Sequence, residues 1–396
     1  MKFSSLTDRV KGGAADVWDT HSKALEAQRE GKDVILLSVG DPDFSTPGPI
    51  VEVAVRSLRE GNTHYTPAAG ITVLRESIAR RHNRLTGASI SKNNVAVTSG
   101  AQNALFGASM CICEAGDEVI VLQPMYVTYE ATIQATGAGL VPVVLSAEDD
   151  FRLDAGRLKA AITPKTRAIY YASPSNPTGM ILNPGNLKVI AGLAIEHDLW
   201  VVADEVYSDI VFGTQCYHIA ALPGMGERSI SIGSMSKSYA MTGWRTGWMV
   251  APEAMIANMA RLSLCMLYGL PGFVQEAAAY ALDNEDAALT QMRDIYWRRR
   301  DLLLEKLGAI AELNVFKPDA GMFLMVDVRG TGLQASEFVR QLYADTGVSV
   351  LDATAFGASA EGFVRVSYAT GEDKLEQGCQ RIVKFIDSLR PISQAV

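Results

Sequence analysis

The sequence predicts an α/β fold in which a mostly parallel sheet lies between layers of helices. Three observations support this prediction. Short β-rich runs alternate with segments of helical periodicity through the middle of the chain. Polar residues follow directly after several of these runs, as expected at the carboxyl ends of parallel strands. The 396 residues, 48% hydrophobic and 20% charged, are enough for two hydrophobic cores.

Seven β-rich runs are expected to form the sheet. They cover residues 95–98, 119–122, 140–145, 168–172, 199–203, 229–232 and 246–250. Between several of them apolar residues recur at helical spacing, and residues 71–86 place Leu74 and Leu85 on one stripe. Residues 186–197 show the same spacing, with Ile195 on the stripe. This alternation is typical of a sheet covered on both faces.

The pattern changes near residue 288. A long amphipathic stretch over 288–310 predicts one helix, and its basic triplet, Arg298 to Arg300, is interpreted as a solvated face. Further elements follow, with strands at 323–328, 348–351 and 363–367 and helices at 334–345 and 372–389. These elements predict a second, smaller α+β unit. We therefore expect an N-terminal segment (1–46) that joins the small domain, a large domain (47–287) and a small C-terminal domain (288–396).

Composition and charge exclude several classes of function. The formal net charge of -8 is spread along the chain without basic blocks, which argues against nucleic-acid binding. No run approaches the length of a membrane span, and the first ten residues lack the apolar core of a secretory signal. We therefore expect a cytoplasmic protein with small-molecule partners and no membrane association. The five cysteines lie in apolar contexts and the five histidines lack metal-binding spacing, so free thiols and no metal site are expected.

A helix start that suits phosphate follows the run 95–98. There Gly100, Ala101 and Gln102 open the next helix. Their free main-chain N–H groups and the positive end of the helix dipole can bind phosphate oxygens. The same segment also fits an ordinary strand-to-helix turn, so this signal needs support from other residues.

That support comes from a cluster around one lysine. Lys237 lies among small residues, with Arg245 eight positions later. The Ser234 and Ser236 hydroxyls and the arginine fork would complete a phosphate site. Beside a cation and apolar residues the ammonium form of Lys237 is disfavoured, so a neutral amine can attack an aldehyde. Asp204 would pair with a protonated pyridine nitrogen and make that ring an electron sink. Taken singly, Lys237 also fits a surface lysine and Asp204 a helix cap.

Three further residues suit the same ring. Tyr207 and Asn176 carry neutral donors for a phenolate oxygen, and Tyr126 offers a flat face for stacking. Each of these three, taken alone, also fits a structural role.

Taken in order, these motifs resemble those of one family. The order Ser-Gly-Ala-Gln, Pro-x-Tyr, Asn-Pro-Thr-Gly, Asp-Glu-Val-Tyr, Ser-x-Ser-Lys and Thr-Gly-Trp-Arg resembles the class I and II aminotransferases, pyridoxal-phosphate enzymes of fold type I. The resemblance extends from Val39 to Ser367. It implies a large domain with a mostly parallel seven-stranded sheet, a smaller α+β domain and pyridoxal 5'-phosphate as cofactor. The implied reaction moves an amino group from an α-amino acid to a 2-oxo acid by a ping-pong mechanism.

The resemblance also implies roles for individual residues. Lys237 would form the Schiff base with the cofactor and then move a proton between the substrate α-carbon and the cofactor. Asp204 would hold the pyridine nitrogen, and Asn176 and Tyr207 the ring hydroxyl. The remaining cofactor contacts would come from Gly100, Ala101, Gln102, Tyr126, Ser234, Ser236 and Arg245.

Substrate and subunit contacts are implied in the same way. Arg365 matches the family arginine that grips the substrate α-carboxylate, and Gly40 and Asn176 match residues of the same pocket. Tyr65 matches a tyrosine that reaches the phosphate of the neighbouring subunit. The resemblance therefore implies a homodimer with shared active sites.

The donor side chain is less constrained. Gln102 stands where bacterial aspartate aminotransferases of this group often carry a lysine for the distal carboxylate, which disfavours aspartate. Residues 260–275 and the Trp18-Asp19-x-His21 segment resemble bacterial arginine:pyruvate transaminases. A cationic donor needs a carboxylate, which Asp16 or Asp19 could supply, although both also fit water-facing helix starts. We expect transfer from L-arginine to pyruvate, with aspartate and 2-oxoglutarate as the alternative pair.

Other classes of protein share some of these features. Ser234-Met-Ser-Lys237 also matches the SxxK signature of penicillin-binding proteins, but the later motifs of that family do not follow it. A β-lyase or decarboxylase of the same fold would use the same cofactor residues and stays an alternative. A regulator with an aminotransferase-like domain would need a DNA-binding module, which we do not expect in this chain.

Overall fold

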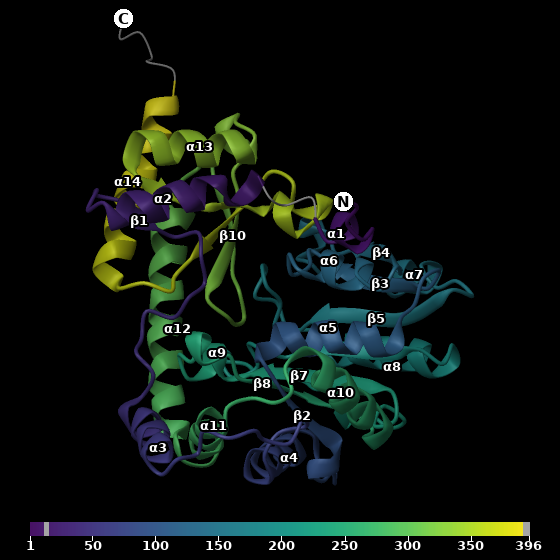
Figure 1. The fold of residues 1–396 in the computed structure, drawn as a ribbon. Coiled ribbons are helices and arrows are strands. Elements are labelled where there is room, and N and C mark those ends of the chain that lie inside the picture. The colour runs from purple at the N-terminus through teal and green to yellow at the C-terminus, as the bar shows by residue number, and fades with distance from the viewer. Residues whose placement is uncertain (12–15, 391–396) are drawn as a thin grey trace, which may run out of the picture.

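The chain folds into two units that share one long helix. The computed structural model describes residues 1–11 and 16–390. Figure 1 shows a large unit around a wide sheet, a smaller unit beside it, and helix α12 (Asp286–Gly308) running along both. Helix α12 contacts α11 (Gly272–Asn284) of the large unit and α14 (Glu372–Leu389) of the small unit. The predicted α/β fold with a smaller α+β unit is confirmed.

Seven strands form the large sheet. They are β2 (Val95–Thr98), β3 (Glu118–Gln123), β4 (Gly139–Val144), β5 (Thr166–Ala172), β6 (Trp200–Asp204), β7 (Ser229–Ser234) and β8 (Gly247–Val250). Their order across the sheet is β2-β8-β7-β6-β5-β3-β4. Strands β7, β6, β5, β3 and β4 are parallel, whereas β8 is antiparallel to both of its neighbours. The predicted seven-stranded, mostly parallel sheet is confirmed.

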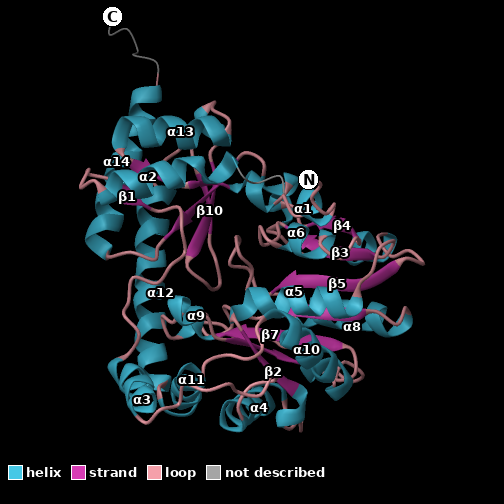
Figure 2. Cartoon of the chain, viewed as in Figure 1, coloured by secondary structure: helices cyan, strands magenta, loops and turns pink. Residues whose placement is uncertain are grey.

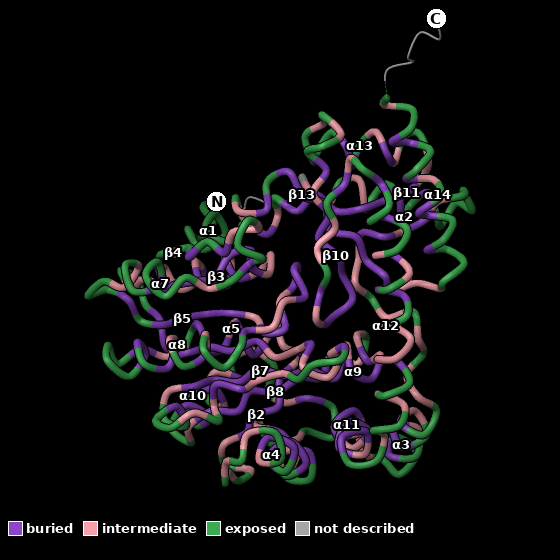
Figure 3. Tube along the Cα trace, turned by 180° about the vertical axis from the view of Figure 1, so that it is seen from behind, coloured by how far each residue is buried: buried purple, intermediate pink, exposed green. Residues whose placement is uncertain are grey.

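Helices cover both faces of this sheet (Figure 2). Besides α11 they are α3 (Gly48–Arg59), α4 (Thr72–Thr86), α5 (Gly100–Ile112), α6 (Tyr129–Gln134), α7 (Ala155–Ala160), α8 (Pro184–Glu196), α9 (Met235–Ser238) and α10 (Glu253–Met266). Neighbouring strand residues point to opposite faces, so Val119 and Val121 of β3 join a core with α5 and α10. Ile120 and Leu122 join a second core with α8. Burial on both faces explains why the strands inside the sheet are almost wholly buried (Figure 3), whereas the edge strand β4 is mostly exposed or half-buried.

The small unit is built on an antiparallel sheet. Its strands are β9 (Asn314–Phe316), β10 (Phe323–Asp327), β12 (Leu351–Asp352) and β13 (Phe363–Ser367). Their order is β12-β13-β10-β9, and every neighbouring pair is antiparallel. Apolar residues of β10 and β13 share a core with α12, α13 (Ala335–Thr346) and α14.

The N-terminal residues pack on the small unit. Strand β1 (Ile35–Leu36) pairs in parallel with β11 (Val348–Ser349), and α2 (Asp19–Arg29) contacts β11 and α13. The short helix α1 (Leu6–Arg9) instead lies beside the large unit, where Arg9 donates two hydrogen bonds to carbonyl groups at the end of α6. The domain boundaries expected from the sequence stay predictions.

Several local expectations are wrong. Arg299 and Arg300 are only 6% and 4% exposed, so the basic triplet is not a solvated face. Leu85 and Ile195 were expected on buried stripes but are 42% and 46% exposed at the ends of their helices. The single strand expected over 348–351 is two short strands, β11 and β12, in different sheets.

Candidate active site

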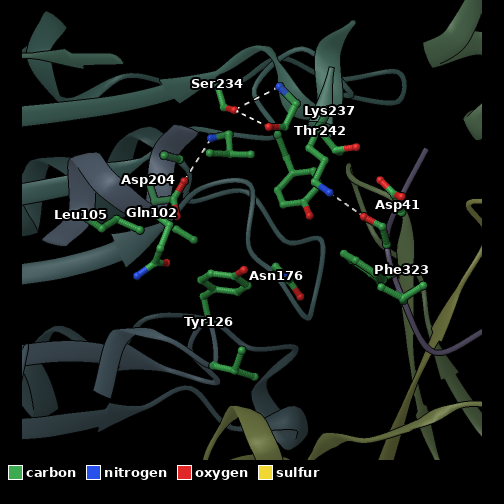
Figure 4. A pocket seen from close by; sticks show the side chains of 18 of the residues that line it. Asp41, Gln102, Leu105, Tyr126, Asn176, Asp204, Ser234, Lys237, Thr242 and Phe323 are labelled. Atoms are coloured by element: carbon green, nitrogen blue, oxygen red, sulfur yellow. Dashed lines mark hydrogen bonds between the residues drawn. The ribbon is translucent and has the colours of Figure 1, made fainter. Parts of the chain in front are cut away.

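A cavity of about 380 Å³ lies at the carboxyl ends of the parallel strands, where the two units meet. Asp204 ends β6 and Ser234 ends β7, as expected for a ligand site in an open α/β sheet. Figure 4 shows Lys237, Asp204 and Tyr126 around this space. The predicted site residues that line it are Gly40, Ala101, Gln102, Tyr126, Asn176, Asp204, Tyr207, Ser234, Ser236, Lys237, Arg245 and Arg365.

Lys237 is a buried amine held at the edge of this cavity. It lies in α9, whose start is capped by the Ser234 hydroxyl, which accepts a main-chain N–H bond of 3.0 Å. The Lys237 Nζ donates to the Gly40 carbonyl oxygen at 2.5 Å. Burial lowers the pKa of Lys237 to about 8, with Asp41 opposing this change and Arg365 adding to it. Part of the population is therefore a neutral, nucleophilic amine at mildly alkaline pH.

Asp204 is a carboxylate held by two donors. Its side chain accepts the Tyr129 hydroxyl at 2.8 Å and the Val206 N–H at 3.2 Å. Burial raises the pKa of Asp204 to about 6, and these two hydrogen bonds limit the rise. The carboxylate is therefore mostly ionised at neutral pH, ready to pair with a cationic ring nitrogen.

The start of α5 lies close to Arg245, and together they offer donors that suit an anion. Ser99, the residue before the helix, makes no side-chain cap, so the first N–H groups of α5 stay available. Gly100 has φ +75°, and a Cβ there would lie 2.5 Å from the Arg245 Nη2 atom. A Cβ on Gly247 would lie 2.7 Å from the Ala101 nitrogen. These glycines let the helix start, the strand and the guanidinium approach one another closely.

Two hydroxyl groups and one amide also line the cavity near the start of α5. The Ser234 Oγ donates to the Ser236 Oγ at 2.9 Å. The Gln102 side chain is held by two threonines: its Nε2 donates to Thr132 and its Oε1 accepts from Thr128, at 2.9 and 2.6 Å. Since both ends of that amide are already bonded, Gln102 contributes to the site chiefly through its main chain.

Arg365 is a buried cation on β13, 3% exposed. It donates to the Asn176 Oδ1 at 2.9 Å and to the Ser38 carbonyl at 2.8 Å. The Arg365 Cζ lies 3.9 Å from the Phe323 ring centroid and 4.9 Å from that of Phe356. Burial lowers the pKa of Arg365 to about 10, which leaves it charged at neutral pH. Its Nε is buried without a protein partner, which suits a substrate carboxylate.

Tyr126 and Tyr207 supply neutral hydroxyl groups. Burial raises the pKa of both phenols above the ordinary value, so both keep their protons at neutral pH. The Tyr207 ring packs edge-on against Phe323, with centroids 6.1 Å apart. Both rings lie in the same cavity as Asn176.

The other candidates lie elsewhere. Gly100 is not part of the lining but packs behind Arg245. Tyr65 is 87% exposed on the surface, where its ring lies 4.9 Å from that of Tyr268. Asp19 is exposed at the start of α2 and does not line the cavity. The side chain of Asp16 lies outside the described part of the chain.

The structure adds residues that the sequence did not single out. Tyr129 bonds to Asp204, and Asp41 and Thr242 line the cavity. Trp18, which the sequence singled out only as part of the segment 18–21, lines it as well. For Tyr129 no sequence signal exists, because its contact to Asp204 spans 75 positions. Asp41 follows directly after Gly40, so the family motif could have indicated it.

Metal clusters and membrane-spanning helices are both absent from the described ranges, 1–11 and 16–390. No group of three His, Cys, Asp or Glu side chains there could hold a metal ion. No helix within those ranges combines the length and the apolar character that crossing a bilayer requires.

Comparisons with known proteins agree with this geometry. A family model described as "Aminotransferase class I and II" matches residues 32–382. An arginine–pyruvate transaminase of Pseudomonas aeruginosa is 47% identical over 382 residues, covering 96% of this chain and 97% of the relative. An aspartate/prephenate aminotransferase of Thermus thermophilus is 37% identical over 371 residues, covering 92% of this chain and 94% of the relative.

Solved structures show the same fold. An aspartate aminotransferase from Thermus thermophilus with maleate has a TM-score of 0.92 and 34% identity, covering 97% of this chain and all of that one. The predicted activity as an aminotransferase, acting on amino and 2-oxo acids, is confirmed. The chain therefore belongs to the class I and II aminotransferases, a family of pyridoxal-phosphate-dependent enzymes.

Proposed function

We propose that the cavity binds pyridoxal 5'-phosphate and that the enzyme moves the amino group of L-arginine to pyruvate. One observation carries the cofactor assignment: the buried amine of Lys237 and the buried carboxylate of Asp204 line one cavity from neighbouring strand ends. The amine suits an aldehyde and the carboxylate suits a pyridinium nitrogen.

The surrounding residues fit this cofactor. The uncapped start of α5, the Ser234 and Ser236 hydroxyls and Arg245 offer donors for a phosphate group. Asn176 and Tyr207 offer donors for the ring hydroxyl, and Tyr126 a face for the ring. When bound, pyridoxal phosphate supplies a reactive carbonyl and a ring that accepts the electron pair of a broken substrate bond.

The protein residues then carry out separate tasks. Lys237 would hold the cofactor through its Nζ atom and would serve as the base for the proton that leaves the substrate α-carbon. Asp204 keeps the ring nitrogen protonated, and Arg365 orients the substrate through its α-carboxylate. Gly40 accepts from Lys237 through its carbonyl and keeps the amine in the cavity. The same residues serve both half-reactions of a ping-pong cycle.

The choice of arginine rests on two observations. The Pseudomonas aeruginosa relative, at 47% identity, is named as an arginine–pyruvate transaminase. In addition, the Gln102 amide bonds to one threonine at each end and brings no cation for a distal carboxylate. The alternative is aspartate with 2-oxoglutarate, which the names of other relatives favour. A β-lyase or decarboxylase is a further alternative, because it would use the same cofactor residues.

Assembly, location and domain division are part of the proposal. We propose a homodimer in which Tyr65 of one subunit reaches the phosphate of the other. In support, Tyr65 and Tyr268 are exposed together, beside the exposed Leu264 and Leu267.

We also propose a cytoplasmic location and the domain division 1–46, 47–287 and 288–396, which the pairing of β1 with β11 supports.

A substrate panel tests this function. The purified enzyme is offered L-arginine, L-aspartate and aromatic amino acids with pyruvate or 2-oxoglutarate, and products are separated by chromatography. We expect alanine to form fastest from arginine and pyruvate. Brisk aspartate turnover without arginine turnover would reverse the order of the two donors. Ammonia or carbon dioxide release without amine transfer would reassign the enzyme to the lyases or decarboxylases. Borohydride should fix the cofactor covalently in the wild type but not in Lys237→Ala.

A further inference from the structure

A second layer of charged side chains lies behind Asp204. Glu205 follows it in the chain, and we call Glu205, His218, Arg81, Asp209 and His82 the Glu205 cluster. None of these five lines the cavity, so the function proposed above does not use them. They come from α4, from the loop after β6 and from the segment before β7.

The cluster contains two direct charge pairs. The His218 Nδ1 lies 3.0 Å from the Glu205 Oε1, and their side chains are only 5% and 11% exposed. Arg81 forms a short ion pair with Asp209, with side chains 10% and 14% exposed. Asp209 also accepts the hydroxyl of Ser238 at 2.6 Å. Ser238 is the neighbour of Lys237, so the cluster connects the loop that follows Asp204 to the helix that carries the lysine.

The charges of the cluster balance only if His218 is protonated. Two carboxylates, Glu205 and Asp209, face one permanent cation, Arg81. Burial lowers the pKa of His82, so this histidine is neutral at pH 7. The groups that face Glu205 and His218 are Arg81, His82, Tyr171, Asp204, Asp209 and Cys216. Burial keeps the tyrosine and the thiol neutral, which leaves His218 as the second cation.

We propose that His218, in its protonated form, neutralises Glu205 and so keeps Asp204 ionised behind the cofactor ring. His218 and Glu205 are then positioning residues: they touch neither substrate nor cofactor and act through Asp204. The inference rests on the proposed role of Asp204 as the partner of the ring nitrogen.

Electrostatics in a buried site explains the coupling. Burial is the main cause of the raised pKa of Asp204, and the charge of Glu205 adds a smaller rise. The same charge is the main cause of the raised pKa of His218. A neutral residue at 218 would leave Glu205 uncompensated in a region of low dielectric, one residue from Asp204. The charge on Asp204 would then be less favourable, and this carboxylate would take up a proton at a higher pH and give up its ion pair with the ring nitrogen. Electron withdrawal, and with it turnover, would fall.

The test uses the enzyme loaded with pyridoxal phosphate. Three variants are compared with the wild type: His218→Gln, Glu205→Gln and the double variant. The first readout is the pH titration of histidine Cε1–Hε1 signals by NMR, which is tractable because the chain has five histidines. The second is the acidic limb of the pH profile of kcat. A purely structural role for the pair would leave the acidic limb of kcat in place, even where the His218 midpoint moves.

Each single variant should shift a different readout. In Glu205→Gln the His218 midpoint should fall by about one pH unit or more, because its counter-ion is gone. In His218→Gln the acidic limb of kcat should move up by roughly half a pH unit, since Asp204 then faces an unpaired charge whose effect on its pKa is smaller than that of burial. The double variant removes both charges. Its acidic midpoint of kcat should therefore differ from the wild-type midpoint by no more than about a third of that shift.

A matched control is available on the surface. His197 lies 3.8 Å from Glu196, but these side chains are 37% and 58% exposed, so His197→Gln should move neither readout. Two results would overturn this inference and leave the proposed function intact. One is a double variant whose loss of activity is the sum of the two single losses, and the other is an unchanged His218 midpoint in Glu205→Gln. Full activity in Asp204→Asn would overturn the proposed role of Asp204 as well. If His218→Gln does not fold, the NMR result in Glu205→Gln decides.

Discussion

The pKa of Lys237 allows a prediction with a calculable size. Burial lowers this pKa from the ordinary 10.5 to about 8. At pH 8 about half of Lys237 is then neutral amine, against about 0.3% for a lysine of ordinary pKa. We therefore expect the Lys237 amine of the cofactor-free protein to react more than about a hundredfold faster than surface lysines of equal intrinsic nucleophilicity.

The same shift should appear in stability, with a definite sign. The unfolded chain binds a proton at Lys237 up to about pH 10.5, but the folded chain binds it only up to about pH 8. Below pH 8 folding therefore costs about 3 kcal/mol at this residue. Lys237→Met removes that cost but also the hydrogen bond to Gly40, worth about 1 kcal/mol. The cofactor-free variant should be more stable by about 2 kcal/mol at pH 7.

Two measurements on cofactor-free protein check these expectations. Competitive labelling of amines between pH 6 and 11, read by mass spectrometry of the peptide that contains Lys237, gives the midpoint directly. Calorimetry of the wild type and Lys237→Met gives the stability difference, which should shrink as the pH rises from 8 towards 10.5. A labelling midpoint near 10.5, together with a destabilised Lys237→Met at pH 7, would refute the claim that burial disfavours the charged amine.

Three further substitutions give distinct expectations. Arg365→Lys should raise KM about tenfold or more for both the amino acid and the 2-oxo acid, because an ammonium cannot grip a carboxylate with two parallel bonds; unchanged KM values would contradict its role. Gly100→Ala places a Cβ at φ +75° and 2.5 Å from the Arg245 guanidinium, so cofactor affinity in equilibrium dialysis should fall about tenfold if this arginine binds the phosphate as proposed. Gly243→Ala, whose Cβ would meet nothing within 4 Å, is its control. Leu303→Ala empties a fully buried position of the small-unit core and should cost about 2–5 kcal/mol in unfolding free energy, whereas Leu85→Ala, on the surface, should cost less than about 0.5 kcal/mol.

Strand content was predictable where strands are long and buried on both faces. Strands β3, β5 and β6 can be recognised in the sequence as apolar runs, because parallel strands between helices have no polar face. Strand ends and sheet membership were not predictable. The apolar run 348–351 is divided between β11, which pairs with β1, and β12, which pairs with β13. Nothing local encodes that division, because it depends on partners more than 300 positions away for β11.

The arginines of α12 show how tertiary contacts override a local pattern. Three successive basic residues resemble a solvated face, yet only Arg298 is exposed, its side chain at 64%. Arg299 forms two hydrogen bonds to Asp43, at 2.7 and 2.8 Å. Arg300 donates to the Pro318 carbonyl and lies over the Phe212 ring. Each buried guanidinium depends on a distant partner, so periodicity alone could not distinguish them.

The cavity lining was largely predictable and its supporting layer was not. Lys237, Asp204 and Arg365 carry chemistry that motifs encode, and all three line one cavity. Their supports, Tyr129 for Asp204 and Ser38 for Arg365, are ordinary residues whose importance comes from position. Such residues become visible only when the fold is known.

The surroundings of Arg365 have a consequence for which compounds the enzyme can accept. Within the described part of the chain no carboxylate pairs with this guanidinium, and two phenyl rings and two carbonyl oxygens fix its position. The carboxylate of a bound amino acid would therefore form an ion pair with Arg365. A simple primary amine would leave this buried cation unpaired. Amines without an adjacent acid group should be rejected at this point, however well the rest of the molecule fits. Residues at the other end of the cavity would then distinguish one amino acid from another. They can differ without changing the contact between Arg365 and the α-carboxylate.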